Sequence, residues 1–325
     1  MLAIVGASGK LGGATLAALL SYKLAEPSEI VAITSSQPGS ETWRSLESKG
    51  VTVRHGTFED GATLEAALQG CDKFFLVSTP RVELDYNDAP EGQGREKHHK
   101  VAIDAALRAG VKHIYYSSLG FGRPSKAGVM RAHIRTETYL ESLGDKVTVT
   151  VMREGLYNES WPLYLMGVDP KSLTALGIDH QGDEGGDEVR VPGDGKVSWT
   201  AIEDLGLASS LVLVPPGAEY AGKTFYLSTP PALAKTLQET AALVTAAGGR
   251  GKDIRVTIVD HQGHEDFYVG EKKMDRSAVQ WWVGVFDALK DGETLIDDPT
   301  LSKLLASKGK KPITMEETVK KMVKG

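Results

Sequence analysis

Residues 2–13 read LAIVGASGKLGG, and this stretch decides the fold. A short apolar run ends at Gly6, and Gly9 and Gly12 follow at intervals of three residues before an apolar pattern with helical spacing begins. Gly6 permits a tight turn out of a strand. Gly9 lets a pyrophosphate approach the backbone, and Gly12 lets the helix pack close to the sheet. Free N–H groups and the positive dipole end at the helix start then favour phosphate. The stretch predicts a dinucleotide-binding loop made of Gly6, Ser8, Gly9, Lys10 and Leu11.

Strands and helices alternate from this loop to residue 153. We expect further strands over 29–34, 51–55, 73–78, 113–118 and 147–153, and helices over 11–20, 41–49, 62–68, 93–109 and 130–143. The strands read as continuous apolar runs, which are typical of strands buried on both faces, and strict alternation with helices indicates a parallel sheet. We therefore predict an α/β fold in which residues 1–153 form a Rossmann-type, doubly wound parallel sheet that binds NAD(P).

The alternation stops near residue 154. The stretch 178–196, rich in Gly, Asp and Glu, predicts an exposed loop or hairpin. Beyond it we expect a strand followed by a helix over 198–213, a strand over 224–227, and helices over 232–247, 273–290 and 314–323. Thr314 and Glu317 have the spacing of a capping box. We expect residues 154–325 to form a smaller α/β substrate lobe, interleaved with the last strands and helices of the Rossmann sheet.

Composition excludes several classes of protein. The formal net charge of −6 over 325 residues gives no cationic surface for nucleic acid. The single cysteine, Cys71, excludes an intrachain disulfide framework and suits a reducing compartment. No apolar stretch approaches the roughly 18 residues of a membrane span, and no signal peptide precedes the first strand. We expect a cytoplasmic protein without a membrane partner. We also expect no metal site, because adjacent His98 and His99 would point to different faces of a helix.

The residues after the second expected strand bear on which nicotinamide cofactor binds. An acidic side chain there would hydrogen-bond the ribose 2′-OH of NAD and repel a 2′-phosphate. The chain offers Thr34, Ser35 and Ser36 instead, and its first carboxylate is at Glu41. Hydroxyls and backbone N–H groups can hold a phosphate, and Lys10 would add positive charge. This pattern favours NADP(H); the alternative is that the hydroxyls only cap the turn.

Candidate catalytic residues come from the fifth expected helix and from the segment after residue 153. Ordinary short-chain dehydrogenases donate a proton from Tyr-x-x-x-Lys, but no tyrosine within residues 1–153 has lysine four residues later. The helix over 130–143 presents His133, which either hydrogen-bonds a ribose or backbone group or relays a proton near neutral pH. Tyr157 either protonates the substrate or shapes the pocket. Trp161 is a candidate for lining a flat, aromatic substrate pocket.

Four further segments carry a family resemblance: VSTP at 77–80, YSS at 116–118, HIRTETYL at 133–140 and MREGLYNES at 152–160. Together with GASGKLGG they resemble the NmrA-like family of atypical short-chain dehydrogenase/reductase relatives. The likeness is strongest to NADPH-dependent quinone reductases and fungal NmrA-like proteins, and it covers roughly residues 1–290. It implies a Rossmann domain, a small C-terminal lobe and a substrate cleft between them.

The resemblance also implies positions around the cofactor. Along the adenine and ribose it would place Thr57, Phe58, Val77, Ser78 and Thr79. Near or over the nicotinamide it would place Ser117, Ser118, Leu119, His133, Gly155, Tyr157 and Asn158, with Asn158 and Trp161 lining the substrate pocket. The sequence departs from the family pattern at two positions. The family often has an acidic residue where Thr57 stands, and a basic residue where Ser35 stands.

The expected function follows from the expected cofactor and from the lack of a Tyr-x-x-x-Lys proton donor. Hydride transfer to a quinone or conjugated imine gives a stabilised anion that solvent can protonate, so the cofactor carries the hard chemistry. We expect an NADPH-dependent oxidoreductase that reduces such a small molecule. The resemblance allows a place in a secondary-metabolite pathway. Two alternatives stay open. One is a non-catalytic NADP(H) sensor that binds a protein partner, and the other is a biosynthetic enzyme that uses the cofactor as a scaffold for a non-redox reaction.

Overall fold

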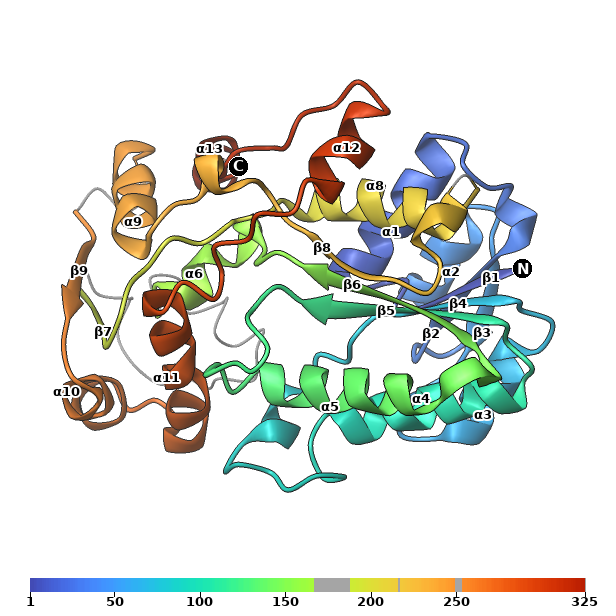
Figure 1. Cartoon of the computed structure of the whole chain (residues 1–325), viewed down its shortest axis with the longest axis horizontal. Helices are drawn as coiled ribbons and strands as arrows, with labels where there is room; N and C mark the ends of the chain where they lie inside the picture. Colours follow the sequence, from blue (N-terminus) through green and yellow to red (C-terminus); the bar gives the residue numbers. More distant parts are fainter. Residues whose placement is uncertain (167–187, 216, 249–252, 325) are drawn as a thin grey trace.

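A seven-stranded sheet, in the order β3-β2-β1-β4-β5-β6-β8, forms the centre of the molecule, and every neighbouring pair in it is parallel (Figure 1). This computed structural model describes residues 1–166, 188–215, 217–248 and 253–324. The strands are β1 (Leu2–Val5), β2 (Ile30–Thr34), β3 (Thr52–His55), β4 (Lys73–Leu76), β5 (His113–Leu119), β6 (Thr148–Glu154) and β8 (Thr224–Leu227). The chain winds outward from β1 to β3 and then returns to β4 beside β1. The predicted doubly wound Rossmann sheet is confirmed.

Helices cover both faces of the sheet. One face carries α1 (Lys10–Ser21), α8 (Ile202–Leu213) and α12 (Thr300–Ala306), and the other carries α3 (Gly61–Leu68), α4 (Glu96–Arg108) and α5 (Met130–Ser142). Alternate residues of β1 enter the two cores, Leu2 and Ile4 on the α1 face and Ala3 and Val5 on the other. This two-sided burial explains why the strands read as unbroken apolar runs.

Elements from the second half of the chain gather beyond the carboxyl ends of β5 and β6 (Figure 1). They are α6 (Trp161–Tyr164), α9 (Leu237–Ala246), α10 (His261–Glu265), a π-helical turn at Asp266–Glu271, α11 (Arg276–Lys290) and α13 (Met315–Lys324), together with a two-stranded parallel sheet of β7 (Glu188–Val191) and β9 (Arg255–Ile258). Helix α2 (Glu41–Glu47) lies beside α1. Short 3-10 helices occur at Pro27–Glu29, Val82–Asp85, Gly144–Lys146, Asn158–Ser160, Gly217–Tyr220 and Pro231–Leu233.

Several boundaries of the second half differ from the prediction. Of the expected loop or hairpin over 178–196, residues 178–187 lie outside the described residues, and the rest includes β7, whose partner β9 is parallel and distant in sequence. No strand forms at 198–201, where Thr200 makes only an isolated bridge with Tyr157. Helix α9 begins at Leu237 because Thr236 and Glu239 form a capping box. The capping box predicted at Thr314 and Glu317 is confirmed by reciprocal bonds of 2.7 and 3.3 Å.

Helices α1 and α8 join the two halves of the chain. A Cβ on Gly206 of α8 would lie 2.6 Å from the Ala14 carbonyl carbon of α1, so the two backbones approach as closely as glycine allows. Helices α8 and α12 and strand β8 all follow residue 153, and they complete the core that α1 begins. None of the described helices is long and apolar enough to cross a membrane.

Candidate active site

The loop between β1 and α1 has the shape that a pyrophosphate needs. Gly6 has a φ of +72°, and a Cβ on Gly12 would stand 2.3 Å from the Gly6 carbonyl oxygen. Gly9 is the N-cap of α1 and supplies no side chain to it, so the first N–H groups of the helix have no side-chain acceptor. Ser8 and Lys10 are exposed and Leu11 is buried. A bulky residue would fill this cradle, and a dinucleotide phosphate fits it.

Apart from His133 on α5, the predicted cofactor residues lie at one edge of the sheet. They stand at or just after the ends of β1, β2 (34–36), β3 (57–58), β4 (77–79), β5 (117–119) and β6 (155–157), and parallel strands bring their carboxyl ends to the same edge. The cradle touches the end of β4, because a Cβ on Gly6 would lie 3.6 Å from Cβ of Val77. The edge therefore forms a continuous platform from the phosphate loop to β6.

The end of β2 holds fewer free hydroxyls than the sequence suggests. Thr34 is buried, and its Oγ1 accepts from the Ser36 N–H at 3.1 Å, so it caps the turn. Ser8 Oγ lies 3.5 Å from the same atom. Ser35 is exposed. Of these hydroxyls, Thr34 therefore matches the capping alternative, whereas Ser35 stays exposed at the strand end.

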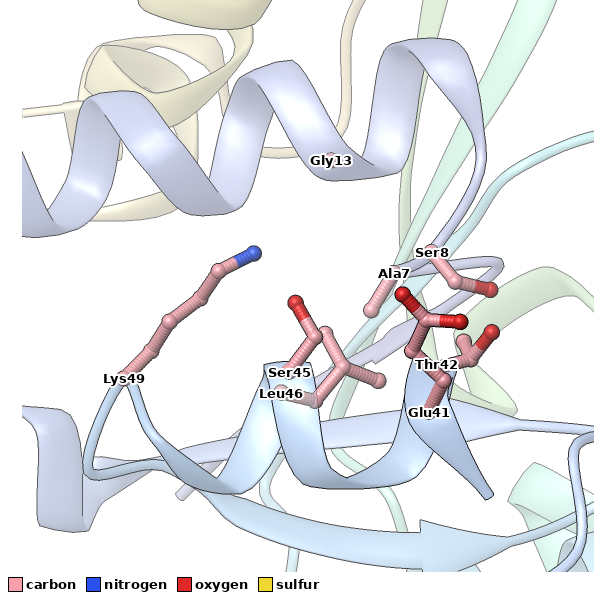
Figure 2. A pocket seen from close by; sticks show the side chains of 8 residues that line it. All are labelled: Ala7, Ser8, Gly13, Glu41, Thr42, Ser45, Leu46 and Lys49. Atoms are coloured by element: carbon pink, nitrogen blue, oxygen red, sulfur yellow. The ribbon is translucent and has the colours of Figure 1, made fainter.

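A pocket of about 300 Å³ opens between α1 and α2 next to the phosphate loop. Its lining is Ala7, Ser8, Gly13, Glu41, Thr42, Ser45, Leu46 and Lys49. Figure 2 shows the Glu41 carboxylate near Ala7 and Ser8, and the Lys49 ammonium at the other end. The sequence placed Glu41 beyond the strand end, but the first turn of α2 brings it back beside the loop. A negative charge therefore stands near the candidate site for a second cofactor phosphate.

The residues after β3 and β4 already have partners within the protein. The Thr57 hydroxyl donates to the Glu59 side chain, and the Phe58 ring lies parallel to the His98 ring with centroids 6.0 Å apart. Beyond β4, the Ser78 N–H donates to Ser117 Oγ at 3.0 Å. These contacts fix the loops that the resemblance assigns to the adenine and ribose.

A buried chain of polar groups runs under the platform from β4 to α5. The Thr79 N–H donates to Nε2 of His99 at 3.2 Å, so this nitrogen must accept and Nδ1 of the neutral ring carries the proton. His99 Nδ1 lies 2.8 Å from Thr136 Oγ1, which itself donates to the Ala132 carbonyl oxygen. A backbone N–H can only donate. The Thr79 N–H therefore fixes which group donates and which accepts in this whole series of hydrogen bonds.

The buried series of hydrogen-bonded groups ends at His133. The Tyr116 hydroxyl lies 2.9 Å from His133 Nδ1 and 3.4 Å from the protonated Nδ1 of His99, so we assign it as a donor to His133. His133 then carries its proton on Nε2. Burial, and next the positive charge of Arg95, hold the pKa of His133 well below its usual 6.5. Of the two predicted roles, the geometry favours a neutral hydrogen-bond donor, and it corrects the alternative of a proton relay near pH 7.

A buried ion cluster ties α5 to β6. Glu137, which is 2% exposed, accepts from Ser118 Oγ at 2.6 Å and from the guanidinium of Arg153 at 2.6 Å. Nε of Arg153 adds a bond at 3.1 Å, and Arg123 adds another at 3.3 Å. The cluster consumes the Ser118 hydroxyl, so this side chain positions the strands. The sequence analysis missed the cluster because its members are far apart in the chain.

Tyr157 lies at the other side of the platform with an unpredicted partner. Its hydroxyl donates to Oε2 of Glu154 at 3.1 Å, and Glu154 is the last residue of β6 and only 1% exposed. Burial raises the pKa of the Glu154 carboxyl to about 8, against a lowering by the Tyr157 hydroxyl. Burial also raises the pKa of Tyr157 well above 10. The half-buried phenol therefore keeps its proton at neutral pH.

Three residues expected at the cleft have structural roles. Asn158 is fully buried, and its amide donates to Thr318 Oγ1 at 2.9 Å and to two carbonyl oxygens of residues 313 and 314. Trp161 is 6% exposed within the apolar core of the second half. A Cβ on Gly155 would meet Thr200 Oγ1 at 2.3 Å. In the described structure Asn158 anchors α13 and Trp161 packs in a core, and their role in a substrate pocket stays a prediction.

The structure also bears on two other kinds of site. The spacing Tyr-x-x-x-Lys occurs at Tyr268 and Lys272, but Tyr268 is 1% exposed and accepts from the Arg190 N–H, on the π-helical turn beyond the sheet. Over the described ranges, no group of three or more His, Cys, Asp or Glu is placed to hold a metal ion. The acidic stretch 179–187 lies outside those ranges.

The comparison with protein families decides the relationship. The model of the NmrA-like family matches residues 1–246. The chain belongs to the NmrA-like family. The matched residues of this NmrA-like protein include the loop after β1 and the strands through β6, which are the parts of the chain that build the platform.

The relatives of this NmrA-like protein are named as oxidoreductases. Quinone oxidoreductase 2 of Escherichia coli is 31% identical over 98% of this chain and 97% of its own length. The NmrA-like family domain-containing oxidoreductase flvB of Aspergillus flavus is 27% identical over 98% and 94%. The crystal structure of the E. coli NADPH-dependent quinone oxidoreductase QOR2 complexed with NADPH superposes with a TM-score of 0.77 at 28% identity, covering 99% of each chain.

Proposed function

We propose that this protein is an NADPH-dependent oxidoreductase that reduces a conjugated small molecule of the quinone or imine class. The observation that carries the proposal is that the phosphate cradle at Gly6–Gly12 and Tyr157, just after β6, lie at the carboxyl edge of the same parallel sheet. NADPH supplies a hydride when bound, and the chain's task is to orient cofactor and acceptor. The E. coli quinone oxidoreductase and flvB, similar over nearly all of the chain, support the reaction class.

The cofactor is held at its phosphates by the cradle and along its length by the platform. The N–H groups of the first turn of α1 bind the pyrophosphate. Ser35, exposed at the end of β2, and Lys10 would contact a 2′-phosphate. Glu41 opposes this contact, so we propose a moderate preference for NADPH over NADH. The NADPH complex of the E. coli relative supports the choice of cofactor.

His133 and Tyr157 have different roles in the proposed reaction. The Nε2–H of neutral His133 donates a hydrogen bond to the cofactor or to an acceptor oxygen, which it can do across the physiological range because burial prevents its protonation. Tyr157 keeps its proton and gives it to the reduced acceptor. The acceptor lies between the carboxyl edge of the sheet and the elements after residue 154, as in the predicted division at 153/154. A place in a secondary-metabolite pathway stays a prediction.

Gly9→Leu tests the cofactor site. Gly9 is exposed and has a φ of −81°, which leucine can adopt, and its Cβ would lie 3.2 Å from the Gly6 carbonyl oxygen, so leucine fills the cradle with at most a small local shift. Fluorescence titration should show NADPH binding in the wild type and its loss in Gly9→Leu, with an unchanged melting temperature. Gly270→Leu, at an exposed glycine of the π-helical turn with open space around it, is the matched control and should bind normally. Equal affinity in both variants contradicts the site.

Turnover separates an enzyme from a sensor. Loss of NADPH absorbance is followed against quinones, conjugated imines and enals. Oxidation of NADPH with one of these acceptors supports the reductase. Tight binding of NADPH and NADP without oxidation by any of them overturns it and leaves the NADP(H) sensor or the non-redox enzyme.

A further inference from the structure

Two carboxylates are buried at the carboxyl ends of β5 and β6, and they differ in their hydrogen-bond and charge partners. Glu137 is held by two arginines and a serine hydroxyl. Glu154 has no such partner. Among the described residues its Oε2 meets only the Tyr157 hydroxyl, and its Oε1, also buried, has no hydrogen bond. A buried carboxylate left without a cation is costly, so the neutral acid is the favoured form.

The surroundings of the pair support this protonation state. Burial is the main cause that raises the pKa of Glu154 to about 8. The groups that act electrostatically on Tyr157 are Glu154 itself, Glu159 and Tyr164, and all of them raise its pKa. Lys10 and Lys321 act on Glu159. At pH 7 the pair therefore holds two protons, one on each oxygen acid.

We propose that Glu154 is the proton reservoir of the active site and restores the Tyr157 hydroxyl after that hydroxyl has protonated the reduced acceptor. This inference rests on the proposed reductase function. It assigns a role to a residue whose side chain lies below the platform, out of contact with solvent. Glu154 acts through Tyr157 and is therefore a positioning and proton-supplying residue.

Bound NADPH would supply a hydride, whose two electrons reduce the acceptor and leave NADP⁺. The anionic oxygen or nitrogen of the reduced acceptor takes the phenolic proton, so the O–H bond of Tyr157 breaks and a new O–H or N–H bond forms. The phenolate oxygen takes the carboxyl proton of Glu154 along the 3.1 Å contact. After product release, one proton from solvent returns through the same hydroxyl to the carboxylate.

Glu154→Gln tests the reservoir because glutamine keeps the size of the side chain and removes its acidic proton. We expect NADPH affinity within twofold of the wild type and kcat lower by about 100-fold with a conjugated imine, whose reduced anion is strongly basic. The loss should be smaller with a quinone, because its reduced anion is less basic. Wild-type kcat should fall above about pH 8, and this break should be absent in Glu154→Gln.

Glu159→Gln is the matched control. Glu159 is the next carboxylate from Tyr157 and accepts from the Ile202 N–H, a bond that glutamine can keep. This variant should keep the break near pH 8. Infrared difference spectra give a readout without turnover, since wild type and Glu159→Gln should both show a protonated carboxyl band at pH 7 that Glu154→Gln lacks.

The outcomes separate the two proposals. Turnover by the wild type with an unchanged pH profile in Glu154→Gln, or an ionised Glu154 at pH 7, overturns the reservoir and leaves the reductase standing. No turnover by the wild type with any acceptor overturns the reductase, and the reservoir falls with it.

Discussion

The Tyr116 hydroxyl and the His133 ring are joined by a 2.9 Å hydrogen bond to Nδ1, and this bond decides which ring nitrogen carries the proton. Both side chains are buried. Neither belongs to a Tyr-x-x-x-Lys pair, which supplies the proton in ordinary short-chain dehydrogenases. The Thr79 N–H donates to Nε2 of His99, so Nδ1 of His99 carries the proton and the Tyr116 hydroxyl donates to His133 instead. A backbone N–H in the loop after β4 therefore determines which nitrogen of a side chain on α5 is protonated.

Tyr116→Phe should remove that control. Without the hydroxyl, both neutral tautomers of His133 become populated. In the wild type, ¹⁵N spectra should show one protonated and one unprotonated ring nitrogen; in the variant, each nitrogen should show a chemical shift averaged over the two tautomers. We expect kcat/KM to fall by about fivefold and the free energy of unfolding by about 1–2 kcal/mol, because His133 Nδ1 loses its donor. Tyr115→Phe, on the neighbouring residue of β5, whose hydroxyl makes no hydrogen bond with the described residues, should leave the ring spectrum unchanged. An unchanged spectrum in Tyr116→Phe contradicts the assignment.

Stability should depend on pH through Glu154. The carboxyl stays protonated in the native state up to about pH 8, whereas the unfolded chain releases the proton near 4.5. Between these values the native state binds more protons, so this group's contribution to stability is complete below pH 4.5 and is lost as pH rises through 8. Relative to wild type, Glu154→Gln should therefore gain about 2 kcal/mol between pH 6 and 8 in denaturant titrations. A constant difference would mean that Glu154 is ionised throughout.

Glu41→Gln should shift cofactor preference. Its carboxylate lines the pocket beside Ser8, where it would oppose the second phosphate of NADPH bound as proposed. Removing one like charge near a protein surface should tighten NADPH by about fivefold and leave NADH nearly unchanged. The measurement is a pair of binding titrations at low salt. Glu26→Gln, an exposed carboxylate before β2, should change neither affinity.

Two adjacent glycines of α1 give a matched pair. A Cβ on Gly12 would overlap the Gly6 carbonyl oxygen at 2.3 Å, whereas one on Gly13 would lie 3.5 Å from the Ala7 oxygen, an ordinary contact. Gly12→Ala should destabilise the protein by about 1–3 kcal/mol and distort the cradle, so that NADPH affinity drops at least tenfold. Gly13→Ala should retain both properties, as measured by thermal unfolding and cofactor titration. Similar behaviour of the two variants would contradict the cradle geometry.

Asn158→Ala should loosen the C-terminal helix. The side-chain amide holds α13 through Thr318 and the carbonyls before the helix, so we expect a loss of about 2 kcal/mol. Hydrogen exchange of residues 315–324 should accelerate. A double-mutant cycle with Thr318→Ala should give a coupling of about 1 kcal/mol. An altered KM with unchanged exchange would support a role of Asn158 in the substrate pocket.

The first half of the fold could be predicted because its signals are local. The apolar run 2–5 and the glycine spacing specify β1, its turn and α1 without reference to any distant residue. The second half depends on contacts across the chain. Strand β7 exists only because β9, far away in sequence, pairs with it, and residues 198–201 fail to form a strand because their neighbours make single bridges.

The candidate site divides in the same way. The motif residues around the cradle were found because glycine spacing has a steric meaning. Glu154 was missed although it stands inside the quoted segment MREGLYNES, because nothing in a sequence reveals that a carboxyl lacks a cation. The bond of Asn158 to Thr318 could not be foreseen, because Thr318 lies in α13, 160 residues further along the chain.

The contact between Ala14 and Gly206 has a consequence for synthesis of the protein. Helix α1 ends at Ser21, and the helix that covers it begins only at Ile202. On the ribosome, the apolar face of α1 therefore stays open while most of the chain is made, and we expect a chain cut after residue 153 to keep that face exposed and to aggregate. The nucleotide-binding half is the first part to be translated and among the last to become fully folded.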